Sequence, residues 1–125
     1  MPRIFVIDDD KDLLRVVKSL LLKRGFDVST YSDWEIANVA LKKYPPQLIL
    51  LDVFLSGIDG LDLCQKLKAN AATRHIPILI FSAYPRVAET AIYEYGADDF
   101  IAKPFELTDL IEKVHGILSH KNESV

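Results

Sequence analysis

The fold is decided by two short stretches, IFVIDDD at residues 4–10 and LILLD at residues 48–52. In each of them an apolar run without in/out alternation ends in aspartate, and a third run, ILIF at residues 78–81, has the same apolar character. Such runs are typical of strands in a parallel sheet that is covered on both faces. Segments 26–30 and 99–102 are more polar, so we predict them as strands nearer the edges of the same sheet.

Stretches with helical periodicity lie between these runs. The last has an apolar stripe from Leu107 to Leu118, and the first has one that stops at Gly25, the usual place for a helix to end. A second helix is predicted to open with a capping box of Ser32 and Glu35 and to end before residues 45–46, and further helices follow residues 60 and 86. The alternation predicts an α/β fold, an open doubly wound parallel sheet of five strands with five helices.

Length and composition suit one domain, predicted at residues 1–119 with a polar tail at 120–125. The net charge of −3 shows no basic footprint for nucleic acid, so no direct nucleic acid binding is expected. The single cysteine, Cys64, excludes an internal disulfide and is predicted to lie in the core, and His75, His115 and His120 show no ligand spacing. No signal peptide or membrane-length apolar run is present, which favours a cytoplasmic protein without membrane contact.

Polar residues follow four of the five predicted strands, at the edge where sheets of this kind bind ligands. The first strand runs into Asp8-Asp9-Asp10, the third into Asp52, the fourth into Ser82 and the fifth into Lys103. Each alone could be a turn residue or a helix cap, and a cap is the preferred interpretation of Asp10.

Together these groups indicate more specific chemistry. Crowded carboxylates repel one another, and a hard divalent cation such as Mg²⁺ relieves that repulsion. A compact positive charge at Lys103 and a hydroxyl donor at Ser82 suit phosphoryl oxygens. A carboxylate, a metal, a lysine and a hydroxyl are the parts needed for phosphoryl transfer onto an aspartate.

From Ile4 to about Leu118 the chain resembles a response-regulator receiver domain of two-component signalling. The resemblance is carried by six segments in order: residues 4–10, 48–52, 58–60, 80–83, 96–100 and 103–105. It implies a flavodoxin-like sheet with strand order 2-1-3-4-5. It also implies a signalling switch that assists its own phosphorylation and dephosphorylation, rather than an enzyme.

The resemblance further implies a role for each site residue. Asp52 is the expected phosphoacceptor. Asp9, Asp52 and the backbone carbonyl of Phe54 are expected to bind Mg²⁺, with Asp8 acting through a coordinated water. Lys103 would pair with the phosphoryl group, and the Lys103–Pro104 bond is expected to be cis, as in the family.

Two residues are implied to form the switch, Ser82 by closing onto the phosphoryl group and Phe100 by turning its ring inward. The surface that changes would comprise the helix after Arg86, the strand at 99–102 and the helix at 107–118. The implied phosphodonor is a sensor histidine kinase or a histidine phosphotransfer protein, and the implied output is a downstream protein target or effector domain.

The chain departs from the family pattern after Asp52, where residues 56–57 replace the usual proline-containing loop. Phe54 and Tyr84 are bulky aromatic residues that would flank the phosphoryl group, and we hypothesise that they hinder the attacking water and prolong the phosphorylated state.

Three other interpretations stay open. Asp8-Asp9-Asp10 contains the D-x-D of haloacid-dehalogenase-like phosphatases, which would leave Asp52 unexplained. A flavodoxin-like binding module would need a phosphate loop where this chain has acids, and a pseudo-receiver would act by protein contact alone. A stand-alone receiver is favoured over one cut from a longer chain.

Overall fold

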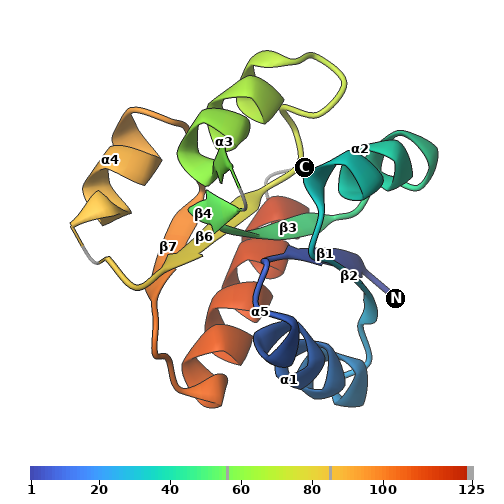
Figure 1. Cartoon of the computed structure of the whole chain (residues 1–125). Coiled ribbons are helices and arrows are strands. Elements are labelled where there is room, and N and C mark those ends of the chain that lie inside the picture. Colours follow the sequence, from blue (N-terminus) through green and yellow to red (C-terminus); the bar gives the residue numbers. More distant parts are fainter. Residues whose placement is uncertain (56, 85, 124–125) are drawn as a thin grey trace.

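The computed structural model describes residues 1–55, 57–84 and 86–123 of the chain. Its centre is a five-stranded parallel sheet in the order β2-β1-β3-β6-β7 (Figure 1). The strands are β1 (Arg3–Ile7), β2 (Asp27–Tyr31), β3 (Leu48–Asp52), β6 (Ile78–Ser82) and β7 (Asp99–Ala102). The predicted fold class and strand order are confirmed.

Helices cover both faces of this sheet (Figure 1). They are α1 (Lys11–Lys23), α2 (Trp34–Lys43), α3 (Gly60–Ala69), α4 (Val87–Tyr93) and α5 (Leu107–Glu123). α1 and α5 pack on one face, and α2, α3 and α4 pack on the other. All five lie where the periodicity predicted them. Because α5 continues to Glu123, the tail predicted from residue 120 begins inside this helix, and residues 124–125 lie outside the described part of the chain.

Each central strand is buried on both sides, which explains the missing alternation in the sequence. All five residues of β3 and all five of β6 are buried. Alternate side chains serve different cores: Leu50 and Phe81 pack with α1 and α5, whereas Leu51 and Ile80 pack with the helices of the opposite face. This period of two sets which side chains reach each side of the strand ends.

The predicted capping box at the start of α2 is wrong by one residue. Asp33 is the cap, and its Oδ1 accepts a hydrogen bond from the backbone N–H of Glu35 at 2.7 Å. Ser32 therefore lies outside the cap. A carboxylate carries a full negative charge toward the positive end of the helix dipole, and this favours Asp33 over the neighbouring hydroxyl.

A short antiparallel hairpin that the sequence analysis did not predict follows β3. It consists of β4 (Phe54–Leu55) and β5 (Ile58–Asp59) and leads directly into α3. Gly57 adopts a φ of 73°, a left-handed conformation that favours glycine in the turn. The neighbouring Ser56 of the noted departure lies outside the described residues.

The remaining predictions about single residues concern the surface and the core. Cys64 is fully buried in the core, as predicted, and burial raises the pKa of its thiol to about 11. His75 and His115 are exposed, whereas the side chain of His120 lies outside the described part. Among the helices that the structure describes, none is long and apolar enough to cross a membrane.

Candidate functional site

Strand register brings Asp8 and Asp52 side by side at the carboxyl edge of the sheet. β1 and β3 are adjacent, with Ile7 opposite Leu51, so the next residue of each strand is an aspartate. One carboxylate oxygen from each of Asp8, Asp9 and Asp52 lies within 4.8 Å of the other two. The predicted acidic cluster is therefore assembled by the fold.

Burial makes two of these carboxylates costly to ionise. Asp8 is 1% exposed and Asp52 is 7% exposed, whereas Asp9 lies at the surface. Burial raises the pKa of Asp8, although hydrogen bonds from Lys103 and from the backbone N–H of Asp10 oppose the rise. Burial and the neighbouring charge of Asp8 raise the pKa of Asp52 to about 6, with Lys103 again opposing.

Lys103 is the cation at this cluster. Its Nζ lies 2.6 Å from Oδ2 of Asp8 and 3.3 Å from Oδ1 of Asp52. The backbone N–H of Lys103 donates a hydrogen bond of 2.8 Å to the carbonyl of Ser82. The peptide bond between Lys103 and Pro104 is cis, as predicted. One ammonium group thus bridges two carboxylates that come from different strands.

Ser82, the predicted hydroxyl donor, is buried at the end of β6. Its Oγ accepts a hydrogen bond of 3.1 Å from the backbone N–H of Tyr84, which leaves the hydroxyl hydrogen for another acceptor. Phe100 lies on β7 with its ring partly buried against the core of the α2, α3 and α4 face.

The rings of Phe54 and Tyr84 contact each other. Their ring centroids are 5.5 Å apart at 79°, an edge-to-face contact, and both side chains are more than half exposed. Phe54 begins β4, shortly after β3, and Tyr84 follows β6, so the contact connects the segments that follow two neighbouring strands.

Asp10 is a helix cap, as predicted. Its Oδ1 accepts hydrogen bonds of 3.1 Å from the backbone N–H groups of Asp12 and Leu13, at the start of α1. Among the described residues, Asp8, Asp9 and Asp52 form a group of carboxylates that could hold a metal ion. A purely carboxylate donor set with crowded, partly buried oxygens fits Mg²⁺.

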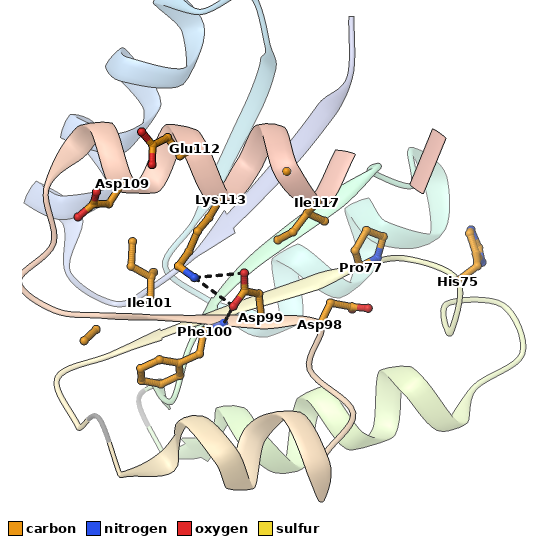
Figure 2. A pocket seen from close by; sticks show the side chains of 12 residues that line it. His75, Pro77, Asp98, Asp99, Phe100, Ile101, Asp109, Glu112, Lys113 and Ile117 are labelled. Atoms are coloured by element: carbon orange, nitrogen blue, oxygen red, sulfur yellow. Dashed lines mark hydrogen bonds and ion pairs between the residues drawn. The ribbon is translucent and has the colours of Figure 1, made fainter. Parts of the chain in front are cut away.

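A groove lies along the outer strand β7 and α5 (Figure 2), and its lining includes none of Asp8, Asp9 and Asp52. Lys113 reaches across from α5, with Nζ 3.2 Å from both carboxylate oxygens of Asp99. Asp98, Asp109 and Glu112 also line the groove, so its walls carry more acidic than basic groups. It belongs to the surface for which the resemblance implies a change.

One residue beside the cluster was missed by the sequence analysis. The ring of Phe81, the residue before Ser82, lies under the ammonium of Lys103, with Nζ 4.8 Å from the ring centroid. In the sequence Phe81 is only one more apolar residue of a buried strand, and nothing there relates it to Lys103.

Fold and site together define an α/β protein with an acidic, lysine-bridged site at the carboxyl edge of its sheet. The model of the response regulator receiver domain matches residues 4–115. A two-component response regulator from Clostridium difficile superposes with a TM-score of 0.88 at 30% identity, covering 98% of this chain and 99% of that one. The chain therefore belongs to the response regulator receiver domain family.

Two curated relatives carry this domain in a longer chain. The DNA-binding response regulator MtrA of Mycobacterium tuberculosis is 34% identical over 97% of this chain and 52% of its own length. The DNA-binding dual master transcriptional regulator RpaA of Synechocystis is 33% identical over 94% of this chain and 49% of its own length. The chain spans about half the length of these relatives.

These relatives correct the expectation that nucleic acid is not a partner. Both are named as DNA-binding proteins. The expectation rested on the net charge of these 125 residues, and that charge carries no information about the half of each relative that the chain does not match.

Proposed function

We propose that this receiver domain accepts a phosphoryl group on Asp52, in a reaction that depends on Mg²⁺, from a phosphohistidine of a kinase or carrier protein. The observation that carries the proposal is the position of the Asp52 carboxylate, within 4.8 Å of those of Asp8 and Asp9 and 3.3 Å from Nζ of Lys103. Family membership supports the same assignment over the phosphatase interpretation.

In the proposed reaction an Asp52 carboxylate oxygen attacks the phosphorus, the P–N bond of the donor breaks, and the donor nitrogen keeps the electron pair. Asp9, Asp52 and the Phe54 carbonyl would hold Mg²⁺, with Asp8 acting through water. The ion, when bound, supplies positive charge for the equatorial phosphoryl oxygens. Lys103 already lies between Asp8 and Asp52, so its ammonium needs only a small shift to meet the same oxygens.

The phosphorylated carboxylate then acts as a switch through Ser82 and Phe100. The buried hydroxyl of Ser82 turns its hydrogen toward the new oxygens, and the ring of Phe100 moves further into the space beside β6. The readout surface is α4, β7 and α5, including the groove in Figure 2. The two states differ by a few kcal/mol, so a few new hydrogen bonds shift their populations. As a member of this family, the protein is proposed to work in the cytoplasm.

Intact-mass analysis after incubation with acetyl phosphate tests the acceptor. Wild type should gain one phosphoryl group with Mg²⁺ and none with a chelator, and Asp52→Asn should gain none. Asp10→Asn is the matched control, because asparagine also caps helices and Asp10 serves as a cap, so this variant should still be labelled. Modification at Asp8 would instead indicate phosphatase chemistry, and no modification at all would indicate a pseudo-receiver.

Beryllofluoride, which mimics the phosphoryl group, tests the switch. With Mg²⁺ present it should move the amide NMR signals of Ser82 and Phe100. Unmoved signals at both residues would contradict the proposed coupling.

A further inference from the structure

We propose that Phe81 is a positioning residue for Lys103. The face of the Phe81 ring holds the Lys103 ammonium at the acidic cluster while Asp52 is being phosphorylated. This inference rests on the proposed function. Phe81 belongs to neither the acidic cluster nor the predicted switch.

Strand pairing explains why the two side chains meet. Phe81 is opposite Ile101 in the β6–β7 ladder, and both pack in the core with α1 and α5. Lys103 comes two residues after Ile101, just past the end of β7, and its ammonium lies over the Phe81 ring. The hydrogen bond from Lys103 N–H to the Ser82 carbonyl fixes its backbone beside Phe81.

The geometry is that of a cation–π contact. Nζ of Lys103 lies 4.8 Å from the Phe81 ring centroid, inside the range of about 6 Å over which such contacts are significant. Phe81 is 1% exposed, and the Lys103 side chain is 22% exposed. Because water is largely excluded from the ring, the attraction should be stronger than at an open surface.

The ring differs from the other partners of Lys103 in one respect. Asp8 and Asp52 attract the ammonium by charge, and both carboxylates are needed by the metal and the phosphoryl group in the proposed reaction. An aromatic face binds no Mg²⁺ and takes up no phosphoryl group, so its attraction persists throughout. Without it, the flexible lysine stem could carry the ammonium out to solvent once the carboxylates have other partners.

Phe105 supports the ring from a different direction. Its ring meets that of Phe81 edge-on, with centroids 6.4 Å apart at 90°. Lys103 and Phe105 lie on either side of Pro104, so one short loop contacts Phe81 through both of its flanking side chains. The Phe81 ring is thus held in place by the same loop that carries Lys103.

Fluorination of the ring separates this role from simple packing. Fluorine withdraws electron density from the ring face while changing the ring volume little. A 4-fluoro, 3,5-difluoro and 3,4,5-trifluorophenylalanine series at position 81 therefore weakens the cation–π attraction while nearly preserving the packing volume. At saturating Mg²⁺ the phosphorylation rate by acetyl phosphate should fall stepwise, by about threefold to tenfold at trifluoro. The same series at Phe5, which is equally buried but packs in the opposite core, should leave the rate unchanged.

NMR of the Mg²⁺-loaded, unphosphorylated protein gives a readout independent of activity. The Cε protons of Lys103 should carry a ring-current shift that Phe81→Leu abolishes. A flat fluorine series, or a shift that disappears when Mg²⁺ is added to wild type, would overturn the inference. Failure of the proposed function looks different, because wild type would then take up no phosphoryl group while the ring-current shift still reports where Lys103 lies.

Discussion

Lys103 is the residue on which most of the site's interactions converge. It bridges Asp8 and Asp52, stacks over Phe81, and is tied through its backbone to Ser82. Each of these partners comes from a strand end, so the position of one ammonium group depends on three strands besides its own. The position of the Lys103 ammonium therefore depends both on the charge of the acidic cluster and on the packing of the Phe81 ring.

Phe54 and Tyr84 give a prediction about the lifetime of the phosphorylated state. Their edge-to-face contact is expected to limit the access of water to phosphorylated Asp52. Phe54→Asn and Tyr84→Glu should each speed hydrolysis of the aspartyl phosphate by about threefold to tenfold. The decay of labelled protein after removal of the phosphodonor measures this rate.

The contact between the Phe54 and Tyr84 rings also predicts that the effects of the two substitutions are not independent. Since either substitution breaks the same ring pair, the double variant should decay less than the product of the two single effects predicts. Phe54→Tyr keeps a ring at the position and serves as the control, with decay close to that of wild type. Decay rates that match wild type in every variant would reject the hypothesis.

At the scale of elements, the junction between β3 and α3 controls where Asp52 lies. The backbone N–H of Gly60 bonds to the carbonyl of Val53 at 2.6 Å, so the start of α3 is pressed against the chain just after Asp52. A methyl group at Gly60 would meet the backbone oxygen of Asp52 and the Cα of Val53, and neither can move without displacing the strand end.

Gly60→Ala should therefore destabilise the protein by about 1–3 kcal/mol, the typical cost of an extra carbon in a well-packed region. It should also slow phosphorylation, because the Asp52 carboxylate shifts with the strand. Denaturant midpoints and acetyl phosphate labelling measure the two effects.

Gly116→Ala on α5 is the matched control. A Cβ at this position meets nothing within 4 Å, and alanine favours a helix by about 1 kcal/mol over glycine. This variant should be as stable as wild type or more so. If both variants unfolded at the same denaturant concentration, the close approach at Gly60 would not matter for stability.

For the whole molecule, folding buries carboxylates whose ionised forms are unfavourable away from water. Asp8 and Asp52 are almost completely buried, and their pKa values rise above the ordinary carboxyl value. A raised pKa means that the folded state binds the proton more tightly than the unfolded chain. Stability from this source is present below the unfolded pKa and is lost as pH rises through the folded value.

Stability in the presence of a chelator should follow this rule. The pKa of Asp52 rises from 3.8 to about 6, so the stability difference between Asp52→Asn and wild type should grow between about pH 4 and pH 6. At pH 7 the variant should be more stable by about 1–3 kcal/mol, and below pH 4 the two should be similar. Chemical denaturation across this pH range gives the difference curve.

Mg²⁺ should reduce the stability advantage of Asp52→Asn at pH 7. Ligand binding to the folded state raises the unfolding midpoint, and wild type offers the full carboxylate set. Wild type should therefore gain more from added Mg²⁺ than Asp52→Asn. The stability difference between the two proteins could instead be independent of pH, with equal stabilisation of both by Mg²⁺. That result would show that burial does not destabilise the ionised form of Asp52.

The sequence by itself determined the class of fold and the members of the acidic cluster. Unbroken apolar runs such as residues 48–51 identify strands covered on both faces, and an aspartate directly after such a run must lie at the carboxyl edge of the sheet. These are local properties of period and polarity, so Asp8 and Asp52 could be assigned to one edge without coordinates. The cap at Asp33 was missed because Ser32 satisfies the same local pattern.

Only the tertiary structure decided which groups touch. The bridge from Lys103 to Asp8 joins residues 95 positions apart, and the placement of the Phe81 ring under that lysine depends on the register between β6 and β7. The same holds for the contact of Phe54 with Tyr84, which needs the segments after β3 and β6 to meet. Distances between side chains from different strands follow from strand order, register and packing, and none of these is encoded in a local window of sequence.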